Sequence, residues 1–256
     1  MIEGMYLSER DATCIFCQQP AIGASVSHIL PASLGGGAWA CLPDGVVCGQ
    51  CNQYFGEKVE NLALQSFPFL PFRVFLGIPT RKGKSPKMAT RLGEVRGSMK
   101  LGRIGLDPLN EKVEKSIHEG RITQLRILAE PTEPTAVCRM LVKMGIEVVA
   151  QDSPEDARGS KFDSARNFAR FPGRGMAWWF VISTNHAELF SKFRNGIGIR
   201  DWLSGVNLSV HQFDEFEIFR LQLMDMIIFT PLDIRVFSPD MREFPEPDYR
   251  LFRVRV

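Results

Sequence analysis

Two short motifs, Cys14-Ile15-Phe16-Cys17 and Cys48-Gly49-Gln50-Cys51, decide how this chain begins to fold. Each motif presents two thiols three residues apart, an arrangement that suits the tetrahedral sites in which zinc is held by four thiolates. The other interpretation is a set of scattered buried thiols, but the paired spacing favours a metal. A structural zinc ion bound by Cys14, Cys17, Cys48 and Cys51 would join two segments that lie far apart in the sequence.

The segment between the motifs contains one histidine, His28, in the run Ser27-His28-Ile29-Leu30-Pro31. Apolar residues predict short strands at 25–30 and 45–47, with a glycine loop at 35–37 between them. Asn52 directly follows the last cysteine, and from there apolar residues recur every three or four positions, which predicts a helix to about residue 65. We therefore expect His28 and Asn52 to face a shared cleft.

The composition is that of a globular protein. The chain has 256 residues, of which 45% are hydrophobic and 23% are charged. Six cysteines are too few for a disulfide scaffold of this length, and the first residues lack the pattern of a signal peptide, so we expect a cytoplasmic protein with no membrane span. Cys41 is a rival metal ligand without a paired cysteine, and Cys138 lies among apolar residues and is expected to be buried.

The net charge of +2 excludes nucleic-acid binding by bulk attraction, but the basic residues are unevenly distributed. Between residues 80 and 103 the only acid is Glu94, and glycines and a proline indicate an exposed loop or hairpin. The basic residues of this stretch are Arg81, Lys82, Lys84, Lys87, Arg91, Arg96, Lys100 and Arg103. We predict that Arg81, Lys82, Lys84, Lys87 and Arg91 contact nucleic acid, although a solvated connector has the same composition.

The rest of the chain predicts a mixed α+β fold. An apolar stripe indicates a buried helix at 136–150, and runs rich in Phe, Ile, Val and Trp indicate strands at 173–183, 217–223 and 226–237. The polar stretch 151–160 is expected to be a loop. We expect three regions, namely a zinc module at 1–70, a basic connector or hairpin at 71–105, and an α+β domain of unknown role at 106–256.

The first quarter of the chain resembles HNH endonucleases of the zinc-knuckle type. The resemblance rests on Cys14-x-x-Cys17, Ser27-His28-Ile29-Leu30-Pro31, Leu34-Gly35-Gly36 and Val46-Val47-Cys48-x-x-Cys51-Asn52-x-Tyr54-Phe55-Gly56. It implies a ββα-metal fold in which His28 is the general base and Asn52 helps to hold a catalytic divalent cation such as Mg²⁺. It further implies a metal-dependent endonuclease that hydrolyses DNA phosphodiester bonds, with double-stranded DNA as the expected substrate and a second copy of the chain as a candidate partner.

The sequence departs from the family pattern in two places. The residue before the histidine is often an acid, but here it is Ser27, and the asparagine that often precedes the second knuckle is absent. We therefore expect Asn52, Ser27 and Glu57 at the catalytic ion, with Asp44 and Glu60 as other sources of a carboxylate. Two further interpretations remain: a non-catalytic zinc-knuckle module that binds nucleic acid, and a rubredoxin-like iron site, which leaves the His28 segment unexplained.

Overall fold

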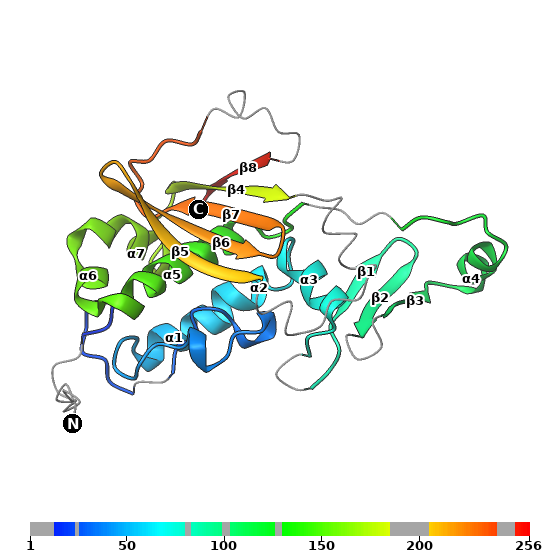
Figure 1. Ribbon diagram of the computed structural model, residues 1–256, viewed down its shortest axis with the longest axis horizontal. Coiled ribbons are helices and arrows are strands. Elements are labelled where there is room, and N and C mark those ends of the chain that lie inside the picture. Colours follow the sequence, from blue (N-terminus) through cyan, green and yellow to red (C-terminus); the bar gives the residue numbers. More distant parts are fainter. Residues whose placement is uncertain are drawn as a thin grey trace.

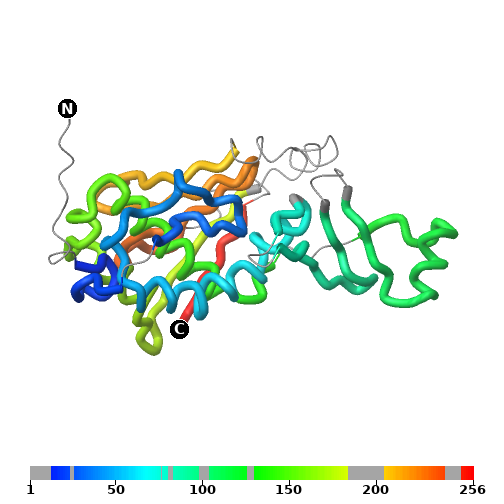
Figure 2. Tube along the Cα trace, turned by 90° about the horizontal axis from the view of Figure 1, so that it is seen from below, coloured from blue at the N-terminus to red at the C-terminus, as the bar shows by residue number. Residues whose placement is uncertain are grey.

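The structure is a computed structural model that describes residues 13–23, 26–79, 83–98, 103–125, 130–184, 205–239 and 249–256. Helices and strands are mixed, and the described strands form two antiparallel sheets (Figure 1). The larger sheet and its helices make the body of the molecule, and the smaller sheet extends from one end of it (Figure 2). Within the described residues, no helix is long and apolar enough to cross a membrane.

The body contains a five-stranded sheet in the order β5-β6-β7-β4-β8. Its strands are β4 (Ala177–Thr184), β5 (Val206–Phe213), β6 (Phe216–Leu223), β7 (Met226–Pro231) and β8 (Tyr249–Arg255). Alternate residues of β6, Phe219, Leu221 and Leu223, are fully buried, as expected for a strand with one face on the core. The strands predicted at 173–183 and 217–223 are thus present. The stretch 226–237, predicted as a strand interrupted by Pro231, is a strand only as far as Pro231, although the next amide, that of Leu232, still donates to the Glu217 oxygen at 2.9 Å.

Helix α5 (Pro134–Asp152) packs on one face of this sheet, with α6 (Pro154–Arg158) and α7 (Asp163–Arg170) beside it (Figure 1). The helix predicted at 136–150 is therefore present. The stretch 151–160, predicted to be a loop, contains α6, because Ser153 Oγ accepts a hydrogen bond from the Asp156 amide at 3.2 Å and a proline follows it at the first helical position.

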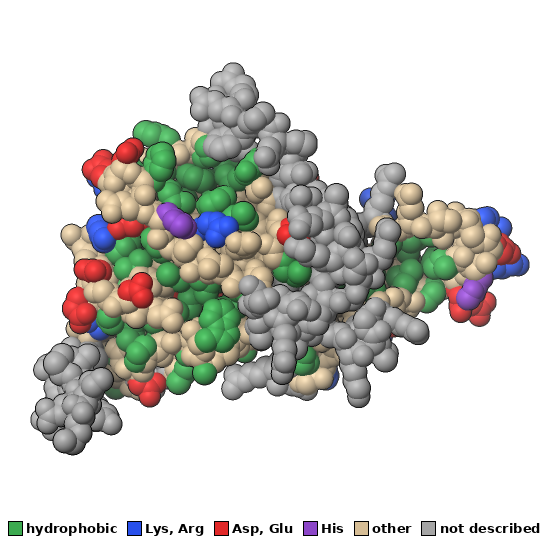
Figure 3. Space-filling view, in the orientation of Figure 1, with side chains coloured by type: hydrophobic (Ala, Val, Ile, Leu, Met, Phe, Trp, Pro, Cys, Tyr) green, Lys and Arg blue, Asp and Glu red, His purple; other side chains and the backbone are tan. Residues whose placement is uncertain are grey.

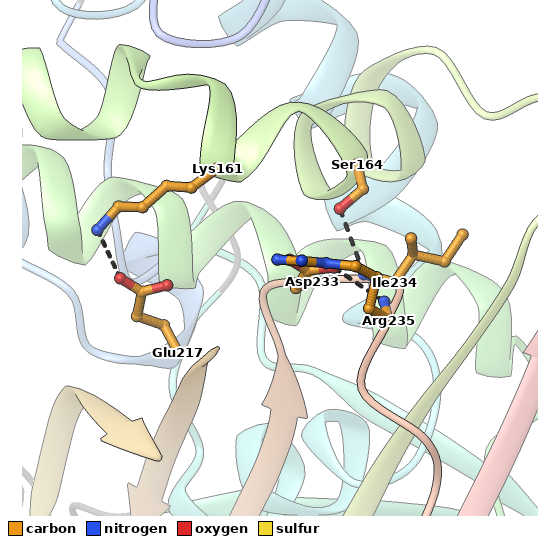
Figure 4. A network of polar contacts seen from close by, with 6 residues as sticks. All are labelled: Lys161, Ser164, Glu217, Asp233, Ile234 and Arg235. Atoms are coloured by element: carbon orange, nitrogen blue, oxygen red, sulfur yellow. Dashed lines mark hydrogen bonds and ion pairs between the residues drawn. The ribbon is translucent and has the colours of Figure 1, made fainter. Parts of the chain in front are cut away.

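Polar contacts fix the α7 region to the ends of the strands (Figure 4). Lys161, in η4 (Ser160–Phe162), donates to Glu217 at 2.6 Å, and Ser164 Oγ accepts from the Ile234 amide at 3.3 Å. Asp233 accepts from the guanidinium of Arg235 at 2.7 Å, and this hydrogen bond holds the pKa of Asp233 below its ordinary value. The first two contacts join the η4–α7 region to residues at the start of β6 and just after β7.

The regular secondary structure of the zinc module is helical. It contains η1 (Ala32–Leu34), η2 (Ala38–Ala40), α1 (Gly49–Phe55), the π-helical stretch η3 (Gly56–Glu60) and α2 (Asn61–Ala63). The last three are continuous, so the helix predicted from Asn52 to about residue 65 is present.

The two strands of the expected ββα order are not formed as strands in the described part of the module. The His28 segment makes only an isolated bridge to Cys41, with the Ile29 amide donating to the Ala40 oxygen at 2.7 Å. Residues 45–47 do not pair with it, because the Val46 oxygen accepts from the Ile15 amide of the first knuckle at 3.0 Å. Val46 and Val47 are both buried. The single bridge between His28 and Cys41 is too short to form a strand.

A single hydrophobic cluster contains residues of the zinc module, of α5 and of the large sheet. Within it, the rings of Phe16 and Phe55 lie 4.5 Å apart. A Cβ added to Gly145 of α5 would lie 2.6 Å from Leu232 Cδ2 and 2.9 Å from Phe219 Cβ, so the helix backbone sits close against the sheet region. The zinc module therefore shares its core with the C-terminal part of the chain.

The smaller sheet has the order β1-β2-β3, formed by β1 (Lys87–Thr90), β2 (Gly93–Ser98) and β3 (Arg103–Pro108). It packs on α3 (Phe69–Leu76) through a small cluster of Val74, Met88 and Val95. The chain then forms α4 (Glu111–His118) at the tip, where Asn110 Oδ1 caps the helix by accepting from the Val113 amide at 3.0 Å. Most of the described residues of the basic stretch thus belong to this sheet.

Candidate metal centre and active site

The four knuckle cysteines lie together. The Sγ atoms of Cys14, Cys17, Cys48 and Cys51 are all within 4.8 Å of one another, and those of Cys17 and Cys48 are 3.7 Å apart. Tetrahedral zinc with Zn–S bonds of about 2.3 Å places its sulfurs about 3.8 Å apart. The donor set and its spacing therefore fit one zinc ion.

Local structure explains why the sulfurs converge. Cys48 is the N-cap of α1, and its Sγ accepts from the Cys51 amide at 3.4 Å. A hydrogen bond from Cys51 lowers the pKa of the Cys14 thiol to about 4, and the same bond raises the pKa of Cys51. The bond thus favours the thiolate form of one cysteine of the pair, which is the form that binds a metal.

One arginine from the C-terminal part contacts this centre, and a second contacts the neighbouring Tyr54. Arg170 donates from Nε to Cys51 Sγ at 3.4 Å, and its guanidinium lies 3.8 Å from the centre of the Tyr54 ring. Arg139 donates to the Tyr54 hydroxyl at 2.6 Å. Because four thiolates exceed the charge of Zn²⁺, a cation beside one sulfur stabilises the centre. The sequence analysis missed both arginines.

The two remaining cysteines lie outside the cluster. Cys41 Sγ donates to the Gly37 main-chain oxygen at 3.2 Å, so its side chain is engaged away from the knuckles. Cys138 is fully buried in α5, and burial raises the pKa of its thiol.

The structure places the His28 segment beside Asn52 of α1. Ser27 Oγ lies 3.5 Å from Asn52 Oδ1, and Asn52 Nδ2 donates to the Val26 main-chain oxygen at 3.2 Å. His28 and Asn52 are both half-buried, so each retains some access to solvent. The two residues predicted to share a cleft therefore belong to adjoining segments.

Ser27 faces the interior. Its exposure is 1%, and its Oγ donates to Glu147 Oε1 at 2.8 Å. Glu147 is fully buried in α5, and burial raises its pKa to about 7 against the attraction of Lys143. Burial alone would lower the pKa of Lys143, but the charges of Glu147 and Glu60 raise it. Sequence analysis missed Lys143 and Glu147, which interrupt an apolar helix four residues apart.

The other acids considered for the catalytic ion differ in their surroundings. Glu57 is exposed and accepts from Gln53 Nε2 at 2.9 Å on the outer side of the helix. Asp44 is exposed in a turn. Glu60 is turned inward and lies 2.9 Å from Lys143 Nζ.

The basic stretch carries fewer unpaired charges than its composition indicates. Lys87 pairs with Glu94 at 2.8 Å, and Arg96 pairs with Asp107 of β3 at 2.6 Å, an acid just outside the stretch. Lys84 and Arg91 are exposed. At the α4 tip, acidic and basic side chains lie together (Figure 3). Arg81 and Lys82 lie outside the described residues.

Four convergent cysteines whose spacing fits zinc, a histidine-bearing segment and a helix asparagine thus lie in one module, which packs on an α+β body. Residues 14–68 match the model of the HNH endonuclease family. No curated protein and no solved structure matches the chain.

Proposed function

We propose that the protein is a metal-dependent endonuclease that hydrolyses phosphodiester bonds of DNA, with double-stranded DNA as the preferred substrate. The observation that carries this proposal is the position of His28, half-buried on a segment that adjoins Asn52 in a module that matches the HNH endonuclease family. The thiolate centre supports a structural zinc ion, which ties the first knuckle to the start of α1.

In the proposed reaction, His28 acts as general base and takes a proton from water as the water oxygen bonds to phosphorus and the P–O bond to the leaving group breaks. A divalent cation such as Mg²⁺ would supply positive charge for the phosphate oxygens. Asn52 is proposed to hold this ion, with Ser27 and Glu57 as further candidates. The burial of Ser27 and its bond to Glu147 argue for an indirect role of that residue.

Substrate affinity is proposed to come in part from Arg81, Lys82, Lys84, Lys87 and Arg91. Phosphate contacts of this kind are independent of sequence and weaken with salt. Exposure of Lys84 and Arg91 supports the proposal, whereas the pairing of Lys87 with Glu94 reduces its free charge.

A second candidate function is a non-catalytic zinc module that binds nucleic acid. It is favoured by Ser27, which occupies the place where the family often has an acid and which is turned toward the interior. Such a protein would bind DNA without cutting it.

A plasmid-nicking assay tests the proposal. The zinc-loaded protein should nick supercoiled DNA with Mg²⁺ and not after EDTA, and His28→Ala should abolish nicking while retaining zinc and DNA binding. His211→Ala is the matched control, because His211 is an exposed histidine of β5 outside the zinc module, and it should cut as the wild type does. Binding without Mg²⁺-dependent cleavage by the wild type would support the second candidate instead.

A further inference from the structure

A buried ion cluster lies directly behind the candidate active site. Lys143 and Glu147 of α5 are both fully buried, and Lys143 Nζ lies 2.7 Å from Glu147 Oε2 and 2.9 Å from Glu60 Oε1. The third partner of the ammonium is the main-chain oxygen of His28, at 2.9 Å. All three N–H donors of Lys143 therefore have an acceptor.

The second oxygen of Glu147 extends the cluster to the other side of the same segment. Glu147 Oε1 accepts the one hydroxyl proton of Ser27 at 2.8 Å, and Asn52 Nδ2 donates to the main-chain oxygen of Val26, the residue before Ser27, at 3.2 Å. Two adjacent residues are thus held from one helix, His28 by its main chain and Ser27 by its side chain. The contacts join α5 to positions 115 and 120 residues away in sequence.

Stability alone is a weak reason for such a cluster. Taking the charges of Lys143 and Glu147 out of water is costly, and apolar side chains of similar volume are often as stabilising. Hydrogen bonds to charged groups, however, are short and directional, so they fix the orientation of the groups they reach. The groups reached here are those that carry the candidate base and the candidate ion ligand.

We propose that Lys143 and Glu147 form a positioning pair, supplied by α5, which holds His28 and Asn52 at a fixed separation. Glu147 acts through Ser27, and Lys143 acts through the His28 carbonyl. The inference rests on the proposed function, because a fixed separation matters only if the two side chains act together. Residues 143 and 147 lie outside the matched residues 14–68, so the zinc module takes this support from the body.

A double-mutant cycle on cleavage tests the pair. Ser27→Ala and Glu147→Gln should each lower kcat by about 10–100-fold with little change in KM, because both side chains are buried away from the surface that a substrate can reach. If Glu147 acts through Ser27, the double variant should be no slower than the slower single variant. Additive losses, or losses in KM alone, would overturn the proposal. Cys138→Ala, at another fully buried position of α5, is the control for lost stability and should keep kcat.

A second readout does not depend on cleavage. The chain has four histidines, so the imidazole signals can be followed by NMR and that of His28 assigned with His28→Ala. Ser27→Ala and Glu147→Gln should shift or broaden the His28 signal, whereas Cys138→Ala should leave it unchanged. An unchanged signal in both variants would refute the positioning role. If the wild type does not cut DNA but the signal moves, the proposed function fails and the structural link stands.

Discussion

Replacement of Lys143 by Met should destabilise the protein strongly. The substitution removes one ammonium that donates to Glu147, to Glu60 and to the His28 main-chain oxygen. Glu147 is fully buried and loses its counter-ion, whereas the Glu60 side chain is 20% exposed and can be hydrated. Breaking a buried pair on one side costs about 3–5 kcal/mol. For a chain of this size, that corresponds to a fall in Tm of about 6–20 °C.

Thermal unfolding of the zinc-loaded protein measures this effect, with Lys161→Met as the matched control. Lys161 also pairs with a glutamate, Glu217, but its side chain is 52% exposed, so its loss should cost less than about 1 kcal/mol. The double variant Lys143→Met/Glu147→Leu removes both charges and should recover most of the loss. The reasoning is refuted if Lys143→Met is no more harmful than Lys161→Met, or if the two changes add.

Four further outcomes follow from the contacts. Gly145→Ala should lower Tm, because overpacking costs about 1–3 kcal/mol of stability and the gain in helix propensity returns only about 1 kcal/mol. An unchanged Tm would contradict the close contact between α5 and the sheet region. Cys51→Ser should lose the zinc. A chelator assay measures this loss against about one zinc ion per wild-type chain. Full retention of zinc by the variant would exclude the four-thiolate site. Asp233→Asn should lower Tm at neutral pH. Since the Arg235 bond lowers the pKa of Asp233, that difference should shrink as pH falls below about 4, and a difference that grows would have the wrong sign. Arg91→Gln should reduce the salt dependence of DNA binding by about one phosphate contact, and an unchanged slope would remove Arg91 from the interface.

Sequence analysis was most successful where the structure is determined locally. The paired cysteines come together as their spacing predicts, and the helix after Asn52 and the buried helix α5 follow from the period of their apolar residues. The two short strands expected at 25–30 and 45–47 are not formed as strands in the described residues, and the His28 segment makes an isolated bridge to Cys41. Both stretches are short and apolar, and the spacing of apolar residues alone does not show which segment each of them pairs with.

The contacts that the sequence did not predict are those that join distant parts of the chain. Arg170 reaches Cys51 over 119 residues, and Glu147 reaches Ser27 over 120. No local pattern encodes such a contact. One signal was present, since Lys143 and Glu147 stand four residues apart within an apolar helix, where a charged pair is expected to have buried partners.

The form of the Lys143 contact bears on how the active site can be tested. Lys143 donates to the main-chain oxygen of His28 and not to its imidazole. This hydrogen bond can therefore form whatever side chain stands at position 28. His28→Ala therefore removes a proton acceptor while the ion cluster, the Ser27 bond and the zinc site keep their partners. Loss of cleavage in that variant, with zinc content and Tm unchanged, would show that the reaction needs the imidazole as its proton acceptor. The same loss in Ser27→Ala, where the imidazole remains, would show that the reaction needs the imidazole to be held in position.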